Sequence, residues 1–254
     1  MDTRRKYKAV IAYDGTAYSG WQYQDNAVGI QEVVEEALKY LEGDAVRVYG
    51  SSRTDAGVHA KGFVAHFFLS KPIPPKNLVK AVNSRLPEAI RFLKAAYAAD
   101  DFDARLSAKG KEYRYQLYQA DIMPPHLVPY WTFCHRPLDL AAMREAASYF
   151  VGRHDFVSFA ANPNRVLETT VRNIFSFEIA KAGPRYTFIV RGDGFLYKQV
   201  RSMVGFLIAV GKGNEKPAAV KDLLEAKSPR TARVETAPSR GLFLWKVFYR
   251  EIGK

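Results

Sequence analysis

The most informative segment of this chain is Gly50-Ser51-Ser52-Arg53-Thr54-Asp55-Ala56-Gly57-Val58-His59-Ala60, a run of small residues that carries an arginine, an acid and a histidine. The runs on either side of it, 45–49 and 63–68, are rich in β-forming residues, which predicts a loop between two strands. Reactive side chains tend to gather on loops that rigid elements hold in place. This loop is therefore the first candidate for a functional site.

Outward from the loop, β-rich runs alternate with segments of helical periodicity, which predicts a mixed α+β fold. The residues 30–41, for example, place apolar side chains at the spacing of an amphipathic helix. Prolines at 72, 74 and 75 mark the start of another helix. Strands are predicted at 7–13, 45–49, 63–68, 90–97, 112–118, 168–180, 185–191 and 242–249, and helices at 30–41, 75–86, 138–151, 195–211 and 217–226.

The two halves of the chain share a short pattern. A predicted strand is followed by Asp14-Gly15 before Tyr18 in the first half, and by Asp193-Gly194 before Tyr197 in the second. The pattern suggests a duplicated unit, so we expect an N-terminal α+β lobe over 1–105, which carries the Asp55 loop, and a C-terminal α+β lobe over 106–254. No Gly/Ser-rich linker separates the halves, and we expect one rigid body with a cleft between the lobes.

The charge of the chain favours a partner with dense negative charge. Its 254 residues include 38 Lys and Arg against 26 Asp and Glu, a net charge of +12. Nucleic acid is the leading candidate, since some of the 15 Tyr and 16 Phe would stack on unpaired bases, although most of these rings would serve the core. An anionic membrane is second, but no apolar run approaches the roughly 20 residues that span a bilayer, and no signal peptide is recognised at the N-terminus.

The single cysteine, Cys134, cannot form an intramolecular disulfide. A chain of this kind fits a reducing compartment, and we expect a cytoplasmic protein in which Cys134 is a buried apolar side chain.

Asp55 is the leading candidate for chemistry. A carboxylate can act as a nucleophile or a base when a cation keeps it ionised away from bulk water, and Arg53 lies two residues before it. The alternative is a solvated ion pair of little consequence. The small residues around Asp55 favour the functional interpretation, because they allow another chain to approach the backbone closely.

Metal and nucleotide sites are not indicated. His59 follows Asp55, but the other histidines form no ligand-spaced pair with it. The acids Asp100, Asp101 and Asp103 would suit Mg²⁺, yet their pattern is more typical of turns and caps. Gly211-Lys212-Gly213-Asn214 lacks the spacing of a phosphate loop. The sequence therefore favours neither a metal site nor a phosphate loop.

Two further segments combine aromatic and basic residues. Around 109–118, Tyr113 and Tyr115 share one strand face while Arg114 points to the other, which fits either base stacking or an ordinary half-buried strand. In the segment after Gly192, a helical continuation would place Tyr197 and Arg201 on one face. Arg201 among apolar neighbours requires a partner, and an acid from another segment is the simplest one.

Taken in order, these segments resemble one enzyme family. The run Gly50–Ala60 is similar to the Gly-Arg-Thr-Asp-Ala-Gly-Val-His-Ala signature of the TruA family of tRNA pseudouridine synthases, with Ser52 where glycine is frequent. The resemblance extends over nearly the whole chain. It includes Tyr13–Gln22, Phe102–Arg105 leading to Lys111–Tyr115, Gly152–Phe156, Phe195–Arg201 and Ala237–Leu242.

The resemblance implies a role for individual residues. Asp55 would be the catalytic aspartate, and the substrate-binding residues would be Arg53, Tyr113, Arg201 and Leu242. Tyr113 would stack on the target uracil, Arg201 would pair with Asp55, Arg53 would hold the target nucleotide out of its stack, and Leu242 would be an apolar neighbour of the uracil.

The resemblance also implies a fold, a reaction and a partner. The fold would be the pseudouridine synthase fold, two similar lobes with mainly antiparallel sheets flanked by helices around a basic cleft. The reaction would isomerise uridine to pseudouridine, without metal or cofactor, in the anticodon stem-loop of tRNA at positions 38 to 40, by a homodimer. The alternatives are a non-catalytic RNA-binding protein, which the charge alone would equally support, and a metal-dependent nuclease.

Overall fold

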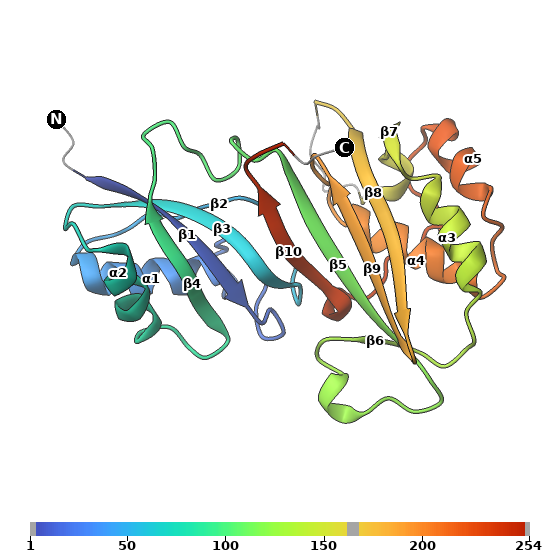
Figure 1. Ribbon diagram of the computed structural model, residues 1–254, viewed down its shortest axis with the longest axis horizontal. Coiled ribbons are helices and arrows are strands. Elements are labelled where there is room, and N and C mark those ends of the chain that lie inside the picture. The colour runs from blue at the N-terminus through green and yellow to red at the C-terminus, as the bar shows by residue number, and fades with distance from the viewer. Residues whose placement is uncertain (1–3, 162–167, 252–254) are drawn as a thin grey trace. The chain divides into compact units, whose positions relative to one another are not determined.

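The computed structural model describes residues 4–161 and 168–251, and the chain forms two compact units (Figure 1). Residues up to Lys109, together with the last strand from Phe243, make up the first unit, and Gly110–Leu242 make up the second. The sequence placed the boundary after residue 105 and assigned the whole last strand to the C-terminal lobe. That strand joins the first unit because it pairs in parallel with the strand that follows the Asp55 loop.

The first unit is built on a sheet in the order β4-β1-β3-β10, with the short β2 paired to β3. Pairing is antiparallel except between β3 and β10, where Phe243 lies opposite His59. The bounds are β1 Arg5–Tyr13, α1 Ile30–Glu42, β2 Tyr49–Gly50, β3 His59–Leu69, α2 Pro75–Asn83, β4 Ile90–Tyr97 and β10 Leu242–Phe248.

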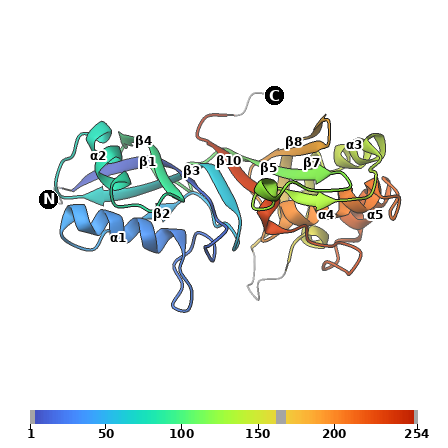
Figure 2. The same ribbon diagram turned by 90° about the horizontal axis from the view of Figure 1, so that it is seen from below.

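Helix α1 covers one face of this sheet, along which it runs in Figure 2. Alternate residues of β1 are fully buried, among them Tyr7, Ala9 and Ile11, as expected of a strand with one face against the core. The helix contributes Val34 and Leu38 to that core. The amphipathic spacing seen in the sequence therefore reports the face that α1 buries.

The second unit has its own sheet in the order β5-β9-β8-β7, with β6 paired in parallel to β5. Helices α3 and α4 pack against each other, α3 on β8 and α4 on β5. The bounds are β5 Gly110–Gln119, η1 Pro125–Leu127, β6 Thr132–Cys134, α3 Leu140–Ser148, β7 Gly152–Asp155, η2 Val157–Phe159, β8 Val171–Ala182, β9 Arg185–Gly192, α4 Gln199–Gly211, α5 Ala219–Ala226 and η3 Ser239–Gly241.

The predicted α+β class, with mainly antiparallel sheets and flanking helices, is confirmed. The strand predicted at 90–97 has those bounds, and each predicted helix is present. Cys134 is buried, as predicted, and its Sγ lies 3.4 Å from the carbonyl oxygen of Arg136. No helix in the described part of the chain is long and apolar enough to cross a bilayer.

Two predictions about elements were wrong. Of the strand expected at 45–49, only Tyr49 is in a strand. The backbone of Val48 is bonded instead to side chains of α1, because its N–H donates to Glu35 at 2.9 Å and its carbonyl accepts from Gln31 at 3.0 Å. Helix α4 begins at Gln199 rather than 195, because Lys198 has a left-handed φ of 58°. Tyr197 therefore lies outside the helix and not on its face with Arg201.

Candidate active site

The loop that carries Asp55 is tied to the segment between β1 and α1. The N–H of Trp21 donates to the carbonyl of Thr54 at 3.2 Å, and the N–H of Gly57 donates to Tyr18 at 3.2 Å. The hydroxyls of Tyr13 and Thr54 are 2.8 Å apart and both are buried. These bonds join the two motifs, Tyr13–Gln22 and Gly50–Ala60, which the resemblance had singled out separately.

Two glycines explain why this contact is so close. A Cβ on Gly15 would lie 2.0 Å from the carbonyl oxygen of Val58, and a Cβ on Gly20 would lie 2.3 Å from that of Thr54. Gly20 also has a φ of +93°, which side-chain-bearing residues rarely adopt. The Asp55 loop is thus held by backbone-to-backbone packing that no other residue type permits at these two positions.

Within the loop, Asp55 is half-buried and Arg53 is exposed. The N–H of Val58 donates to the carbonyl of Asp55 at 3.1 Å, which closes a turn in which Gly57 has a φ of +74°. The turn fixes the backbone of the carboxylate while water still reaches its side chain.

His59 has a structural place beneath the loop. It is 1% exposed, its ring stacks on Phe243 with centroids 4.6 Å apart, and its Nδ1 accepts the N–H of Gly15 at 3.1 Å. Asp14 Oδ1 also lies 3.1 Å from this nitrogen. In the described residues, no three His, Cys, Asp or Glu side chains are arranged to hold a metal ion. His59 is therefore a supporting residue of the loop.

In the second unit, β5 carries Tyr113 on a buried face. Tyr113 is 6% exposed, and its ring meets that of Phe195 edge to face at 5.2 Å. Tyr115 is fully buried on the same face, and its hydroxyl contacts Thr132 at 2.5 Å and donates to the carbonyl of Pro238 at 2.9 Å. Burial raises the pKa of Tyr115 far above its usual value, so the hydroxyl keeps its proton.

The segment before β10 is joined to α4 and to β5. Arg201 Nε donates to the carbonyl of Ala237 at 2.8 Å, and the N–H of Ala237 donates to the carbonyl of Arg201 at 3.0 Å. A Cβ on Gly241 would lie 2.8 Å from the ring of Tyr115. The second unit thus brings together the elements that carry Tyr113, Arg201 and Leu242, whereas Asp55 and Arg53 belong to the first unit.

The sequence did not single out Glu112, whose side chain joins β5 to β9 on the face opposite Tyr113. The carboxylate is 5% exposed and accepts from Arg114 Nε at 2.7 Å and from Arg191 Nε on β9 at 2.7 Å. Burial would raise the pKa of Glu112, but the bonds from Arg191 and Arg114 outweigh it and hold that pKa below its usual value. The alternation of acid and base along 111–114 was the available signal, since it places Glu112 and Arg114 on one face.

We expect Glu112→Gln to lower the free energy of unfolding by about 2–3 kcal/mol at neutral pH, because two charge-assisted hydrogen bonds are weakened while both arginines remain. Urea denaturation measures the change. The matched control is Glu178→Gln, which also removes a partner of Arg191, at 3.2 Å, but from a side chain that is 59% exposed. Its expected cost is below about 1 kcal/mol.

The difference between wild type and Glu112→Gln should also depend on pH. Because the folded-state pKa is lowered, the contribution is fully present above the unfolded pKa of about 4.3 and is lost as the pH falls through the folded value. The stability difference should therefore be constant near neutrality and shrink in acid. Equal stability losses in the two variants, or a difference that grows in acid, would contradict the role of Glu112.

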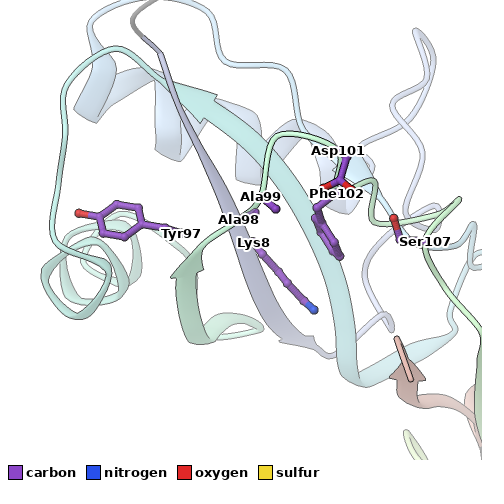
Figure 3. A pocket seen from close by; sticks show the side chains of 7 residues that line it. All are labelled: Lys8, Tyr97, Ala98, Ala99, Asp101, Phe102 and Ser107. Atoms are coloured by element: carbon purple, nitrogen blue, oxygen red, sulfur yellow. The ribbon is translucent and has the colours of Figure 1, made fainter. Parts of the chain in front are cut away.

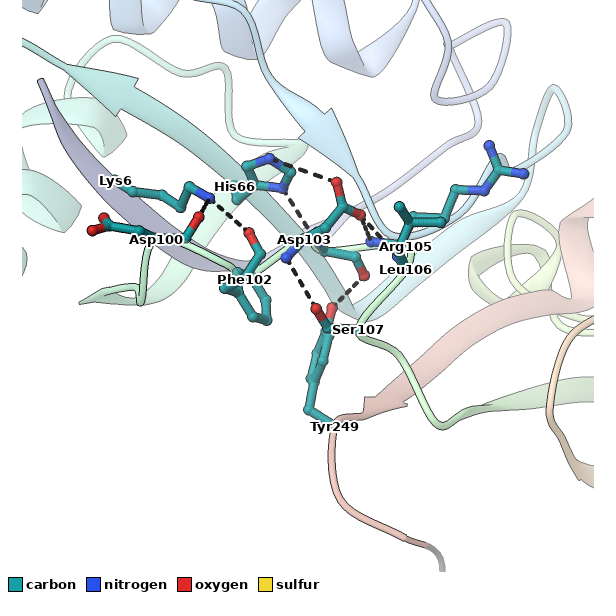
Figure 4. A network of polar contacts seen from close by, with 10 residues as sticks. Lys6, His66, Asp100, Phe102, Asp103, Arg105, Leu106, Ser107 and Tyr249 are labelled. Atoms are coloured by element: carbon teal, nitrogen blue, oxygen red, sulfur yellow. Dashed lines mark hydrogen bonds and ion pairs between the residues drawn. The ribbon is translucent and has the colours of Figure 1, made fainter. Parts of the chain in front are cut away.

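The acidic cluster after β4 is a turn, as the sequence favoured. Asp103 Oδ1 accepts the N–H groups of Arg105 at 2.7 Å and Leu106 at 2.8 Å (Figure 4). Burial opposes ionisation of Asp103, but these donors and the nearby His66 and Lys6 lower its pKa overall. His66 anchors the same turn, because its Nδ1 accepts the N–H of Ala104 at 3.0 Å.

Comparison with known families shows that this α+β chain is an RNA-modifying enzyme. The family model described as tRNA pseudouridine synthase matches residues 9–106 and 146–250, well over half of the chain. The chain belongs to the tRNA pseudouridine synthase family.

Curated relatives resemble the chain over almost its full length. It is 43% identical to "tRNA pseudouridine synthase A" of Exiguobacterium sibiricum, over 98% of this chain and 99% of the relative. It is 41% identical to "tRNA pseudouridine synthase A 2" of Clostridium perfringens, over 96% of this chain and all of the relative. The protein of that first name from Chlamydia trachomatis serovar A is 43% identical, over 96% of this chain and 92% of the relative. The predicted resemblance is confirmed.

Proposed function

We propose that the isomerisation of uridine to pseudouridine by this tRNA pseudouridine synthase takes place in the anticodon stem-loop of tRNA, at positions 38 to 40. The observation that carries the proposal is the backbone packing that fixes the Asp55 loop, with Gly15 and Gly20 against the carbonyls of Val58 and Thr54. A binding protein gains nothing from a carboxylate held toward RNA, since it repels phosphate, whereas an isomerase requires one.

The reaction breaks the N1–C1′ bond, turns the uracil and joins C5 to C1′. The proton on C5 is released and N1 acquires one, so every atom is accounted for within the substrate and water, and no cofactor is proposed. Asp55 would attack C1′ or C6, or remove a sugar proton. All three roles require an ionised carboxylate within reach of the nucleotide.

The other candidate residues take their proposed roles from the same motifs. We assign the positioning of the flipped nucleotide to Arg53, whose exposed side chain suits contact with RNA. Arg201 is proposed as the cation that pairs with Asp55, and Leu242 as an apolar neighbour of the uracil. Leu242 is 5% exposed, which suits an apolar contact.

The proposed state of the protein is a cytoplasmic homodimer in which one tRNA touches both subunits. The single cysteine, Cys134, agrees with a reducing compartment. Sedimentation of the protein with and without tRNA measures the oligomeric state. A monomer that retains full activity when saturated with tRNA would contradict the dimer.

The decisive experiment is incubation of the purified protein with unmodified tRNA, with and without a chelator, followed by mapping of pseudouridine. We expect pseudouridine at positions 38 to 40 in both samples. Binding without product would identify an RNA-binding protein, and chelator-sensitive strand cleavage would identify a nuclease. Pseudouridine elsewhere in the tRNA would support the proposed reaction but rule out positions 38 to 40 as its target.

For Tyr113→Phe we expect a rate within about threefold of wild type, because stacking on a uracil requires the ring and not the hydroxyl. Tyr113→Leu removes the aromatic face, and stacking contributes about 1–3 kcal/mol for each base, so the loss should be roughly tenfold to a hundredfold. Single-turnover rates with saturating enzyme measure both. If the Phe variant is as slow as the Leu variant, the hydroxyl takes part in proton transfer and the stacking role alone is rejected.

A further inference from the structure

A hollow of about 350 Å³ opens in the first unit beside β1 and the segment that follows β4 (Figure 3). Lys8 of β1 extends into it, and Asp101, Phe102 and Ser107 line it from that segment, with Tyr97 at the end of β4. None of the proposed site residues lines this hollow. It is therefore a separate feature of the first unit.

The ammonium group of Lys8 in this hollow is not paired with a carboxylate of the described residues. Lys8 Nζ lies 3.8 Å from the ring centroid of Tyr249 and 4.6 Å from that of Phe102. Among the residues that the structure describes, the ammonium group of Lys8 has no hydrogen bond and no ion pair, and burial lowers the pKa of Lys8. Aromatic faces stabilise a cation only partly, so an anion that entered the hollow would meet an unneutralised ammonium group.

Ser107 supplies a hydrogen-bond donor at the same place. Its Oγ accepts the N–H of Asp103 at 3.0 Å, so the oxygen is occupied as an acceptor and its own proton has no partner among the described residues. The wall is also fixed, because Lys6 Nζ donates to the carbonyls of Asp100 at 2.5 Å and Phe102 at 3.0 Å (Figure 4). A preformed wall lowers the entropic cost of binding.

We propose that this hollow is a phosphate-binding subsite in which Lys8 is the counter-cation and Ser107 a hydrogen-bond donor. The phosphate belongs to a nucleotide, either within the tRNA or free. In the antiparallel pairing of β1 with β3, Lys8 lies opposite His66. His66 is seven residues along β3 from His59, where the Asp55 loop ends, so the subsite lies roughly 23 Å along the strand from that loop. The inference thus goes beyond the proposed catalytic site and does not depend on its chemistry.

The carboxylate of Asp101 provides an internal check, because it lines the hollow and repels an anion. The two substitutions Lys8→Met and Asp101→Asn should therefore act in opposite directions on phosphate affinity. Asp101 is exposed, so its substitution leaves the fold intact. The control is Lys94→Met, which removes the same charge from outside the hollow. Lys94 is an exposed residue of β4 that lies opposite Val10 of β1.

The first measurement is titration of the full chain with inorganic phosphate and with uridine monophosphate, followed by NMR of the lysine side chains. We expect saturable shifts of the Lys8 signals and a rise of the Lys8 pKa by about 1, as a nearby opposite charge produces. Lys8→Met should abolish phosphate binding, Asp101→Asn should tighten it about threefold, and Lys94→Met should leave it unchanged.

The second measurement is tRNA affinity as a function of salt, which identifies the source of the phosphate. If the subsite holds the RNA backbone, Lys8→Met weakens tRNA binding about threefold to tenfold at low salt and reduces the salt slope by about 1, and Lys94→Met has a smaller effect. If tRNA affinity is unchanged while phosphate binding is lost, the ligand is a free nucleotide. Two results together would overturn the proposed subsite: the NMR signals of Lys8 do not respond to phosphate, and Lys8→Met and Lys94→Met have equal effects on tRNA binding.

Discussion

Asp55→Asn is expected to abolish pseudouridine formation while tRNA affinity stays at the wild-type value or rises slightly. The substitution keeps the shape of the side chain and removes its charge, so a nucleophile or base is lost without a change in the packing of the loop. Loss of a residue of this kind costs about 10⁴-fold or more in rate. Release of tritium from C5-labelled uridine in tRNA measures the reaction, because C5 loses its hydrogen when it bonds to C1′.

The matched control for Asp55→Asn is Asp25→Asn, which removes an acid from an exposed position of the same unit. It should leave rate and affinity unchanged. If Asp55→Asn still forms pseudouridine at a rate near that of the control, Asp55 is not the catalytic residue. If Asp55→Asn loses tRNA binding as well as rate, the carboxylate supports the fold of the loop rather than the chemistry.

Gly20→Ala is expected to abolish pseudouridine formation, because the substitution displaces the Asp55 loop although residue 20 is not part of that loop. The new Cβ would lie 2.3 Å from the carbonyl oxygen of Thr54 on a backbone with φ +93°. The backbone of residue 20 fixes this Cβ, and the oxygen of Thr54 belongs to the backbone, so neither atom can rotate out of the contact. The expected loss in the free energy of unfolding is roughly 3 kcal/mol or more. Urea denaturation and the tritium assay measure stability and rate on the same sample.

Gly183→Ala separates the two causes of that loss. Gly183 also has a positive φ, +56°, but a Cβ there would meet nothing within 4 Å. Its cost should be about 1 kcal/mol, the backbone strain alone, with full activity. Equal losses in the two variants would show that strain, and not the contact with Thr54, accounts for the effect of Gly20→Ala.

Periodicity predicted most of the fold because each sheet is covered on one face. The alternation along β1 and the spacing along α1 both record which side is buried, and a pattern of that kind is legible in a single sequence. The failures have local causes. Val46 and Val48 have the residue types of a strand, but the backbone of Val48 forms its hydrogen bonds with side chains of α1 and not with a neighbouring strand.

The candidate site was predicted less completely. The small residues around Asp55 pointed to close packing, yet the partner backbone at Gly15 and Gly20 lies more than thirty residues away in the sequence. The sequence did not indicate a binding role for Lys8, because a lysine in a strand is ordinarily a solvated residue. Its setting depends on Phe102 and Tyr249, which only the folded sheet brings to it.

The place of β10 in the first unit has a consequence for how the protein is made. Phe243 pairs with His59, which emerges from the ribosome 184 residues earlier (243 − 59). At ordinary rates of synthesis, roughly 5–20 residues per second, His59 and Ala60 of β3 remain without this neighbour for about 10–40 s. An unpaired strand edge invites association with other chains. Nascent chains that stop before β10 should therefore aggregate more readily than the complete chain.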